Sequence, residues 1–127
     1  MKRFPIRHVL GVGVLLSGMC MLSAFAGIGD PAAGKVTYEK ACSMCHGMTG
    51  KGDGSTAGAL NPRPRNHTDG QYMNTLTDDY LFKVIKEGGV SVGKSALMPA
   101  WGAQIEDEDI HNVIAYVRTL AVPLYTP

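Results

Sequence analysis

Two cysteines and a histidine lie close together in the first half of the chain, in the sequence Cys42-Ser43-Met44-Cys45-His46. The Cys-x-x-Cys-His pattern is typical of covalent haem attachment. Each cysteine sulfur can add to one haem vinyl group, and the histidine that follows is then placed to ligate the iron from one side. The pattern therefore predicts one haem c, with Cys42 and Cys45 as thioether residues and His46 as the proximal axial ligand.

Two other kinds of site use paired cysteines, and the sequence favours neither. A thioredoxin-like dithiol belongs to a βαβ unit, and no such alternation of strands and helices is evident. A zinc site needs two more ligands at metal-binding spacing, which His67 and His111 do not supply.

A second axial ligand must come from another part of the chain. Met98 lies in a loop that we expect between two helices, and Pro99 restrains the backbone next to it. We therefore predict Met98 as the distal ligand and keep His67 as the alternative. The other candidates are less suitable. Met44 and Met48 lie within or beside the attachment motif, and His111 lies on the last predicted helix. Met73 precedes a predicted helix, and packing is its simpler role.

A histidine and a thioether on one iron favour electron transfer over catalysis. The soft thioether raises the reduction potential relative to a second imidazole. Because both axial positions are then filled, substrate chemistry at the iron is not expected. We accordingly predict no catalytic residues and no enzymatic activity of the chain alone.

Helices must hold these residues. Asp30 can cap a first helix that starts at Pro31 and runs into Cys42. The stretch from Gly47 to Asn66 is rich in glycine and keeps no helical or strand period, so we predict a loop there.

Two further helices follow this loop. One begins near Thr77 and ends at Gly88-Gly89, and the other runs from about Glu106 to Leu120 with acidic residues in its first turn. No segment has a clear strand pattern, and the predicted fold class is therefore all-α.

The first 26 residues resemble a secretory signal. A basic head precedes an uncharged apolar run from Val9 to Ala26, which ends in Ala24-Phe25-Ala26. We expect cleavage after Ala26, which leaves a haem domain over 27–127 in the periplasm. The alternative is an uncleaved membrane anchor that faces the periplasm.

Charge and motifs exclude some partners. Removal of residues 1–26 leaves nine basic and eleven acidic side chains, a net charge of −2, which does not suit nucleic acid. The segment from Gly88 to Ser95 matches the phosphate-loop pattern, but a helix precedes it where that motif needs a strand, so no nucleotide is expected.

Four segments together resemble class I c-type cytochromes over nearly all of the chain after residue 26. The haem motif is one of them, and the others are Gly34–Tyr38, Leu97–Gly102 and Asp109–Leu120. The resemblance implies a cytochrome c-like fold with three main helices around the haem. It also implies that the N- and C-terminal helices cross where a small residue meets an aromatic one, here Gly34 and Tyr116.

The resemblance further implies contacts around the haem. A proline carbonyl in the loop after the motif would accept a hydrogen bond from the proximal imidazole, and Pro62 is the candidate, although it could simply stiffen the loop. Trp101 could pack on the haem with its indole N–H on a propionate. Arg63 and Arg65 could pair with the propionates or remain solvated.

The family's role is one-electron transfer, alone or within a larger redox enzyme. We expect a monomeric periplasmic carrier whose donor and acceptor are redox proteins that dock at the exposed haem edge. The first alternative is a haem subunit or anchored module of a membrane oxidase or dehydrogenase, in contact with a membrane only if the N-terminal segment is retained. A gas sensor or peroxidase-like enzyme would require an open sixth position.

Overall fold

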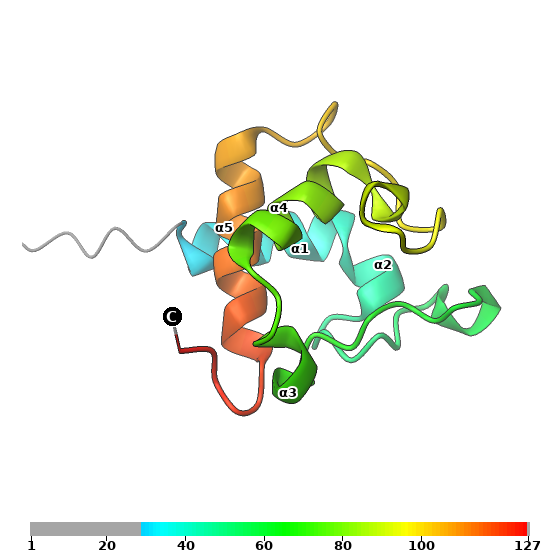
Figure 1. Ribbon diagram of the computed structural model, residues 1–127, viewed down its shortest axis with the longest axis horizontal. Coiled ribbons are helices and arrows are strands. Elements are labelled where there is room, and N and C mark those ends of the chain that lie inside the picture. Colours follow the sequence, from blue (N-terminus) through cyan, green and yellow to red (C-terminus); the bar gives the residue numbers. More distant parts are fainter. Residues whose placement is uncertain (1–28, 127) are drawn as a thin grey trace, which may run out of the picture.

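A computed structural model describes residues 29–126, and the expected signal segment over 1–26 lies outside the described residues. Figure 1 shows helices connected by long loops. Three helices are long: α1 (Pro31–Ala41), α4 (Asp78–Glu87) and α5 (Asp107–Leu120). Four elements are short: α2 (Ser43–His46), the 3₁₀ turns η1 (Ala57–Ala59) and η2 (Gly89–Val92), and α3 (Gly70–Met73). Within the described residues the structure is helical, with one isolated parallel bridge between Asp69 and Val122.

The ends of the long helices follow from their capping residues. The side chain of Asp30 accepts a hydrogen bond from the backbone N–H of Ala32, and Thr77 does the same for Tyr80 at the start of α4. The first turn of α5 carries three acidic residues, which the helix dipole favours. The three predicted helices are therefore confirmed.

Helices α1 and α5 cross at a backbone-to-backbone contact. A Cβ atom added to Gly34 would overlap the carbonyl of Asn112, so only glycine allows this approach. Gly34 lies at the crossing, as predicted, and the aromatic partner Tyr116 lies one turn beyond Asn112 on α5. There it packs edge-to-face on Tyr38, one turn beyond Gly34, with ring centroids 5.1 Å apart.

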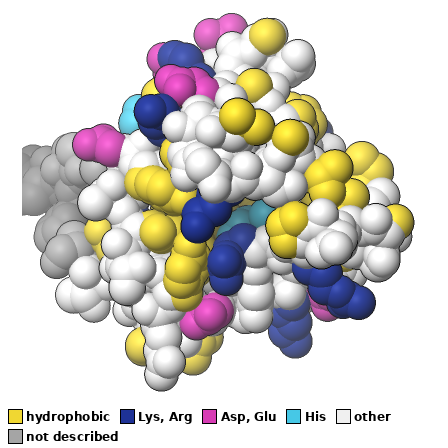
Figure 2. All heavy atoms as spheres, turned by 45° about the vertical axis from the view of Figure 1, so that its right-hand side comes forward, with side chains coloured by type: hydrophobic (Ala, Val, Ile, Leu, Met, Phe, Trp, Pro, Cys, Tyr) yellow, Lys and Arg dark blue, Asp and Glu magenta, His cyan; other side chains and the backbone are white. Residues whose placement is uncertain are grey.

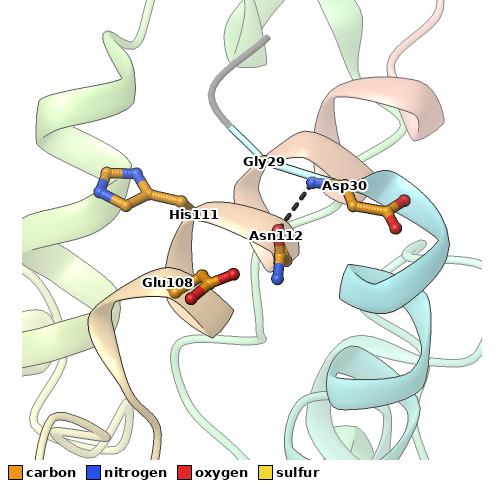
Figure 3. Close-up of a pocket in the computed structure, with 5 residues that line it drawn as sticks. All are labelled: Gly29, Asp30, Glu108, His111 and Asn112. Carbon is orange, nitrogen blue, oxygen red and sulfur yellow. Dashed lines mark hydrogen bonds between the residues drawn. The ribbon is translucent and has the colours of Figure 1, made fainter. Parts of the chain in front are cut away.

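Asp30, which precedes α1, is also hydrogen-bonded to α5 at this crossing. The backbone N–H of Asp30 donates to Oδ1 of Asn112 at 2.7 Å, as Figure 3 shows. His111 is the neighbour of Asn112, and its ring lies parallel to that of Phe82 on α4, with centroids 4.7 Å apart. One turn of α5 therefore contacts both other long helices.

The hydrophobic core lies between the long helices and includes the short helix α3. Its largest fully buried side chains are Tyr38, Met73, Ile110, Ile114 and Val113. We predicted a packing role for Met73, which is confirmed. Met73 precedes α4, as predicted, and it also ends α3, a single turn that the sequence patterns did not reveal.

A buried arginine joins three parts of the fold. Arg118 on α5 is only 8% exposed, and its Nε and Nη2 donate to Oδ1 of Asp78 at 2.9 and 2.7 Å. Its remaining donors bind the carbonyls of Met73 and Leu76 at 2.7 and 2.6 Å. The guanidinium therefore links α5 to the end of α3 and to the start of α4.

Within residues 29–126, no helix is long and apolar enough to cross a membrane.

Candidate haem site

The Cys-x-x-Cys-His motif forms the short helix α2 directly after α1. Cys42 lies at the junction, and its carbonyl accepts hydrogen bonds from the N–H groups of Cys45 and His46 at 3.2 and 2.9 Å. Both thiols are free, with Cys42 buried and Cys45 half-buried. Burial, with a smaller effect of the Cys45 charge, raises the pKa of Cys42 to about 12. The Cys42 sulfur is therefore neutral at physiological pH.

The motif is held in place by the chain on both sides of it. The hydroxyl of Tyr38 donates to the carbonyl of Gly47 at 3.1 Å, which ties α1 to the residue after His46. The glycine-rich loop then folds back, so that Gly52 N–H donates to the His46 carbonyl at 2.8 Å and Gly54 N–H to that of Cys45 at 3.2 Å. The predicted loop therefore packs around the attachment motif.

The ring of His46 is oriented by a carbonyl, but not by the predicted one. Nδ1 of His46 lies 3.0 Å from the carbonyl oxygen of Arg65, whereas Pro62 is exposed. The acceptor differs because the N–H of His67 donates to the carbonyl of Gly50 at 2.6 Å, which draws the chain around Arg65 against the motif. With Nδ1–H donating to this carbonyl, Nε2 of His46 is the nitrogen left for a metal.

The environment keeps this imidazole neutral. Burial lowers the pKa of His46 from its usual value, although the bond to the Arg65 carbonyl acts in the opposite direction. A neutral imidazole is the form that ligates metals.

The Met98 loop is bound to the end of α4. The N–H of Gly89 donates to the Met98 carbonyl at 2.9 Å, and the N–H of Trp101 donates to the Ile85 carbonyl at 3.0 Å. Met98 and Trp101 are half-buried and pack on the hydrophobic core. These two hydrogen bonds therefore fix the backbone that carries the Met98 thioether.

The structure places the other candidate ligands less favourably. His67 lies beside His46 with the ring centroids 4.3 Å apart, so it is on the same side as the proximal ligand. His111 packs on Phe82, and Met44 and Met48 are exposed. These positions support Met98 as the distal ligand.

Haem contacts of the remaining residues stay predictions. Arg63 and Pro62 are exposed in the loop, and Trp101 is half-buried. The guanidinium of Arg65, which is also exposed, lies 3.9 Å above the ring of Tyr72. Figure 2 shows histidine side chains in a hollow on one face, bordered by hydrophobic and by basic side chains.

The residues present fit a covalently bound haem. Two free thiols lie one helical turn apart, the following histidine has one ring nitrogen engaged and the other available, and a thioether lies on a separate braced loop. This donor set is the one that haem c uses in electron-transfer proteins.

Comparisons with known proteins agree with this site. The profile of the family described as "Cytochrome C oxidase, cbb3-type, subunit III" matches residues 29–117. Cytochrome c-555 of Chlorobaculum tepidum is 37% identical over 121 residues, 92% of this chain and 95% of the relative. Cytochrome c-554(547) of Halothiobacillus neapolitanus is 33% identical over 97 residues, 72% of this chain and 98% of the relative.

A solved structure has the same fold. Cytochrome CL from Methylophaga aminisulfidivorans superposes with a TM-score of 0.53 at 24% identity, over 70% of this chain and 51% of that chain. The all-α cytochrome c fold is therefore confirmed. The chain belongs to this family of c-type cytochrome domains, which are electron-transfer proteins that carry a covalently bound haem c.

Proposed function

We propose that the chain is an exported carrier with a single haem, held by Cys42 and Cys45 and ligated by His46 and Met98. The observation that supports it most is the hydrogen bond from His46 to the Arg65 carbonyl, which leaves Nε2 free to bind iron. Bound haem c supplies a one-electron Fe(III)/Fe(II) couple.

Backbone hydrogen bonds around the site would hold its geometry when the charge of a bound iron changes. The Arg65 carbonyl orients His46, and the bonds from Gly89 and Trp101 brace the Met98 loop. With haem bound, the Met98 thioether would favour Fe(II), and His46 and Met98 together would leave no position on the iron for a substrate. Rigid ligation of this kind suits rapid electron exchange.

We propose a periplasmic haem domain over 27–127, preceded by a cleaved signal over 1–26. The basic head and apolar run of the N-terminal segment support export. The partners would be redox proteins that dock briefly near the haem through a small interface. A monomer is the expected state.

A second function is a haem module of a membrane oxidase or dehydrogenase. The matching family profile, which is described by a subunit of a cbb3-type oxidase, is the observation in its favour. The mass of the exported protein separates the two proposals. Loss of residues 1–26 and recovery in the periplasmic extract support a free carrier, and an intact chain in the membrane fraction supports the module.

Absorption spectra test the ligand assignment. The oxidised wild-type holoprotein should have the weak far-red band of methionine ligated to Fe(III), and Met98→Ala should lose it while it retains the covalent haem. Met48→Leu is the matched control, since Met48 is 57% exposed, and it should keep the band. A band that survives in Met98→Ala, or carbon monoxide binding to the reduced wild type at neutral pH, would contradict the proposal.

A further inference from the structure

The ring of His67 lies flat against the ring of His46. Their centroids are 4.3 Å apart and their planes differ by 16°. Aromatic pairs in proteins usually have centroids about 4.5–7 Å apart, so these two rings are in direct contact. One face of the proximal imidazole is therefore covered by a second flat ring.

His67 is itself held by its neighbours. Its backbone N–H donates to the carbonyl of Gly50 at 2.6 Å, and its ring Nδ1 lies 3.4 Å from the hydroxyl oxygen of Tyr38. Tyr38 is fully buried on α1, and its ring meets that of His67 edge-on with centroids 5.8 Å apart. The His67 ring is thus enclosed between a fixed tyrosine and the ring of His46.

The two contacts of His46 restrict different motions. The hydrogen bond to the Arg65 carbonyl fixes the direction in which Nδ1 points. A ring held by that bond alone could still turn about the bond axis. The stacked ring of His67 opposes this turn, because any rotation of the His46 plane would bring the two rings into collision.

We infer that His67 is a positioning residue, whose ring sets the plane of the His46 imidazole relative to the bound haem. This inference rests on the proposed function, because it takes His46 as an axial ligand. The plane of an axial imidazole decides which iron d orbital overlaps the π electrons of the ring. It therefore controls the magnetic anisotropy of Fe(III), which can be measured independently of electron-transfer activity.

The proposed role depends on a flat ring. Phenylalanine keeps a flat ring at position 67, whereas leucine fills a similar volume without one. His67→Phe should therefore preserve the His46 plane, and His67→Leu should release it. Asp78→Asn is a control for general destabilisation, because Asp78 accepts hydrogen bonds from Arg118 on α5 and so stabilises another part of the fold.

The test uses the oxidised holoproteins. We expect the electron paramagnetic resonance g values and the proton shifts of the haem methyl groups to match the wild type in His67→Phe and in Asp78→Asn. In His67→Leu we expect the largest g value to shift and the order of the methyl resonances to change. Wild-type spectra in His67→Leu would overturn the inference.

A measurement on the wild type covers the case in which His67→Leu does not assemble. In the reduced, diamagnetic protein, ring protons of His46 and His67 should show nuclear Overhauser contacts, and their absence would overturn the inference. The proposed function is read from a different signal. A missing far-red band in the wild type contradicts the ligand assignment, whereas a normal band with unchanged spectra in His67→Leu contradicts only the role of His67.

Discussion

Gly34 on α1 lies against the peptide carbonyl of Asn112 on α5, so closely that no side chain fits between the two helices. Gly34→Ala should therefore push the helices apart. Overpacking of a core typically costs about 1–3 kcal/mol, and a backbone obstacle that cannot turn away places this variant at the upper end. Urea unfolding of the holoprotein measures the loss.

Gly58→Ala is the control for this glycine. An added Cβ at Gly58 has no neighbour within 4 Å. The free energy of unfolding of Gly58→Ala should stay within about 0.5 kcal/mol of that of the wild type. Equal stabilities of the Gly34 and Gly58 variants would contradict the described crossing.

Gly89→Ala should disturb the Met98 loop. The added Cβ would overlap the carbonyl of Ser95 and come within 3.2 Å of the Met98 Cβ. It would also strain the hydrogen bond from the Gly89 N–H to the Met98 carbonyl. We expect weakening of the far-red methionine–iron band and a loss of about 1–3 kcal/mol in stability. Retention of the full band in this variant would show that the loop does not depend on Gly89.

Arg118→Met should be strongly destabilising. It would leave the Asp78 carboxylate and the carbonyls of Met73 and Leu76 without the donors they use now. Removal of one partner of a buried pair costs about 3–5 kcal/mol. Chemical denaturation gives the value, and a double-mutant cycle with Asp78→Asn separates the pair from the carbonyl bonds.

Lys35→Met provides the surface comparison for Arg118. Lys35 pairs with Glu39 at 3.8 Å, and the two side chains are 57% and 36% exposed. Such pairs contribute about 0.3–0.5 kcal/mol. If Lys35→Met and Arg118→Met lost similar amounts of stability, the structural role assigned to Arg118 would be wrong.

Tyr38→Phe should change how stability depends on alkaline pH. Burial holds the pKa of Tyr38 well above its usual value of 10.0, and nearby charges add smaller effects in the same direction. Above about pH 10 the unfolded chain releases this proton and the folded protein keeps it, so stability falls by up to about 1.4 kcal/mol per pH unit. Tyr38→Phe has no hydroxyl to titrate, so this cause does not lower its free energy of unfolding.

The two proteins should therefore converge as the pH rises. At neutral pH, Tyr38→Phe should be about 1 kcal/mol less stable, because the Gly47 carbonyl loses its donor. Between pH 10 and pH 11 this difference should shrink or reverse. Urea unfolding of both proteins from pH 8 to pH 11 measures it, and a constant difference would contradict the raised pKa.

Local sequence was enough to predict the elements whose signals lie within a few neighbouring residues. The caps Asp30 and Thr77 and the acidic first turn of α5 mark helix starts through contacts with adjacent backbone. The haem motif is equally local, because two thioethers and a ligand must reach one small group.

Contacts between distant segments were not predictable in the same way. The Arg65 carbonyl, rather than Pro62, meets His46 because a bond between His67 and Gly50 decides where the loop returns. A backbone carbonyl is the same group in every residue, so no residue type could indicate which one would accept the bond.

By itself, the sequence determined the helical class and the kind of cofactor and predicted the attachment residues, since these depend on residue types at short spacing. Only the tertiary structure decided which carbonyl orients His46, what Gly34 touches, and that His67 packs on His46 and not opposite it. The reason is physical: such partners come together through the path of the whole chain, and that path follows from packing and backbone hydrogen bonds summed over many residues.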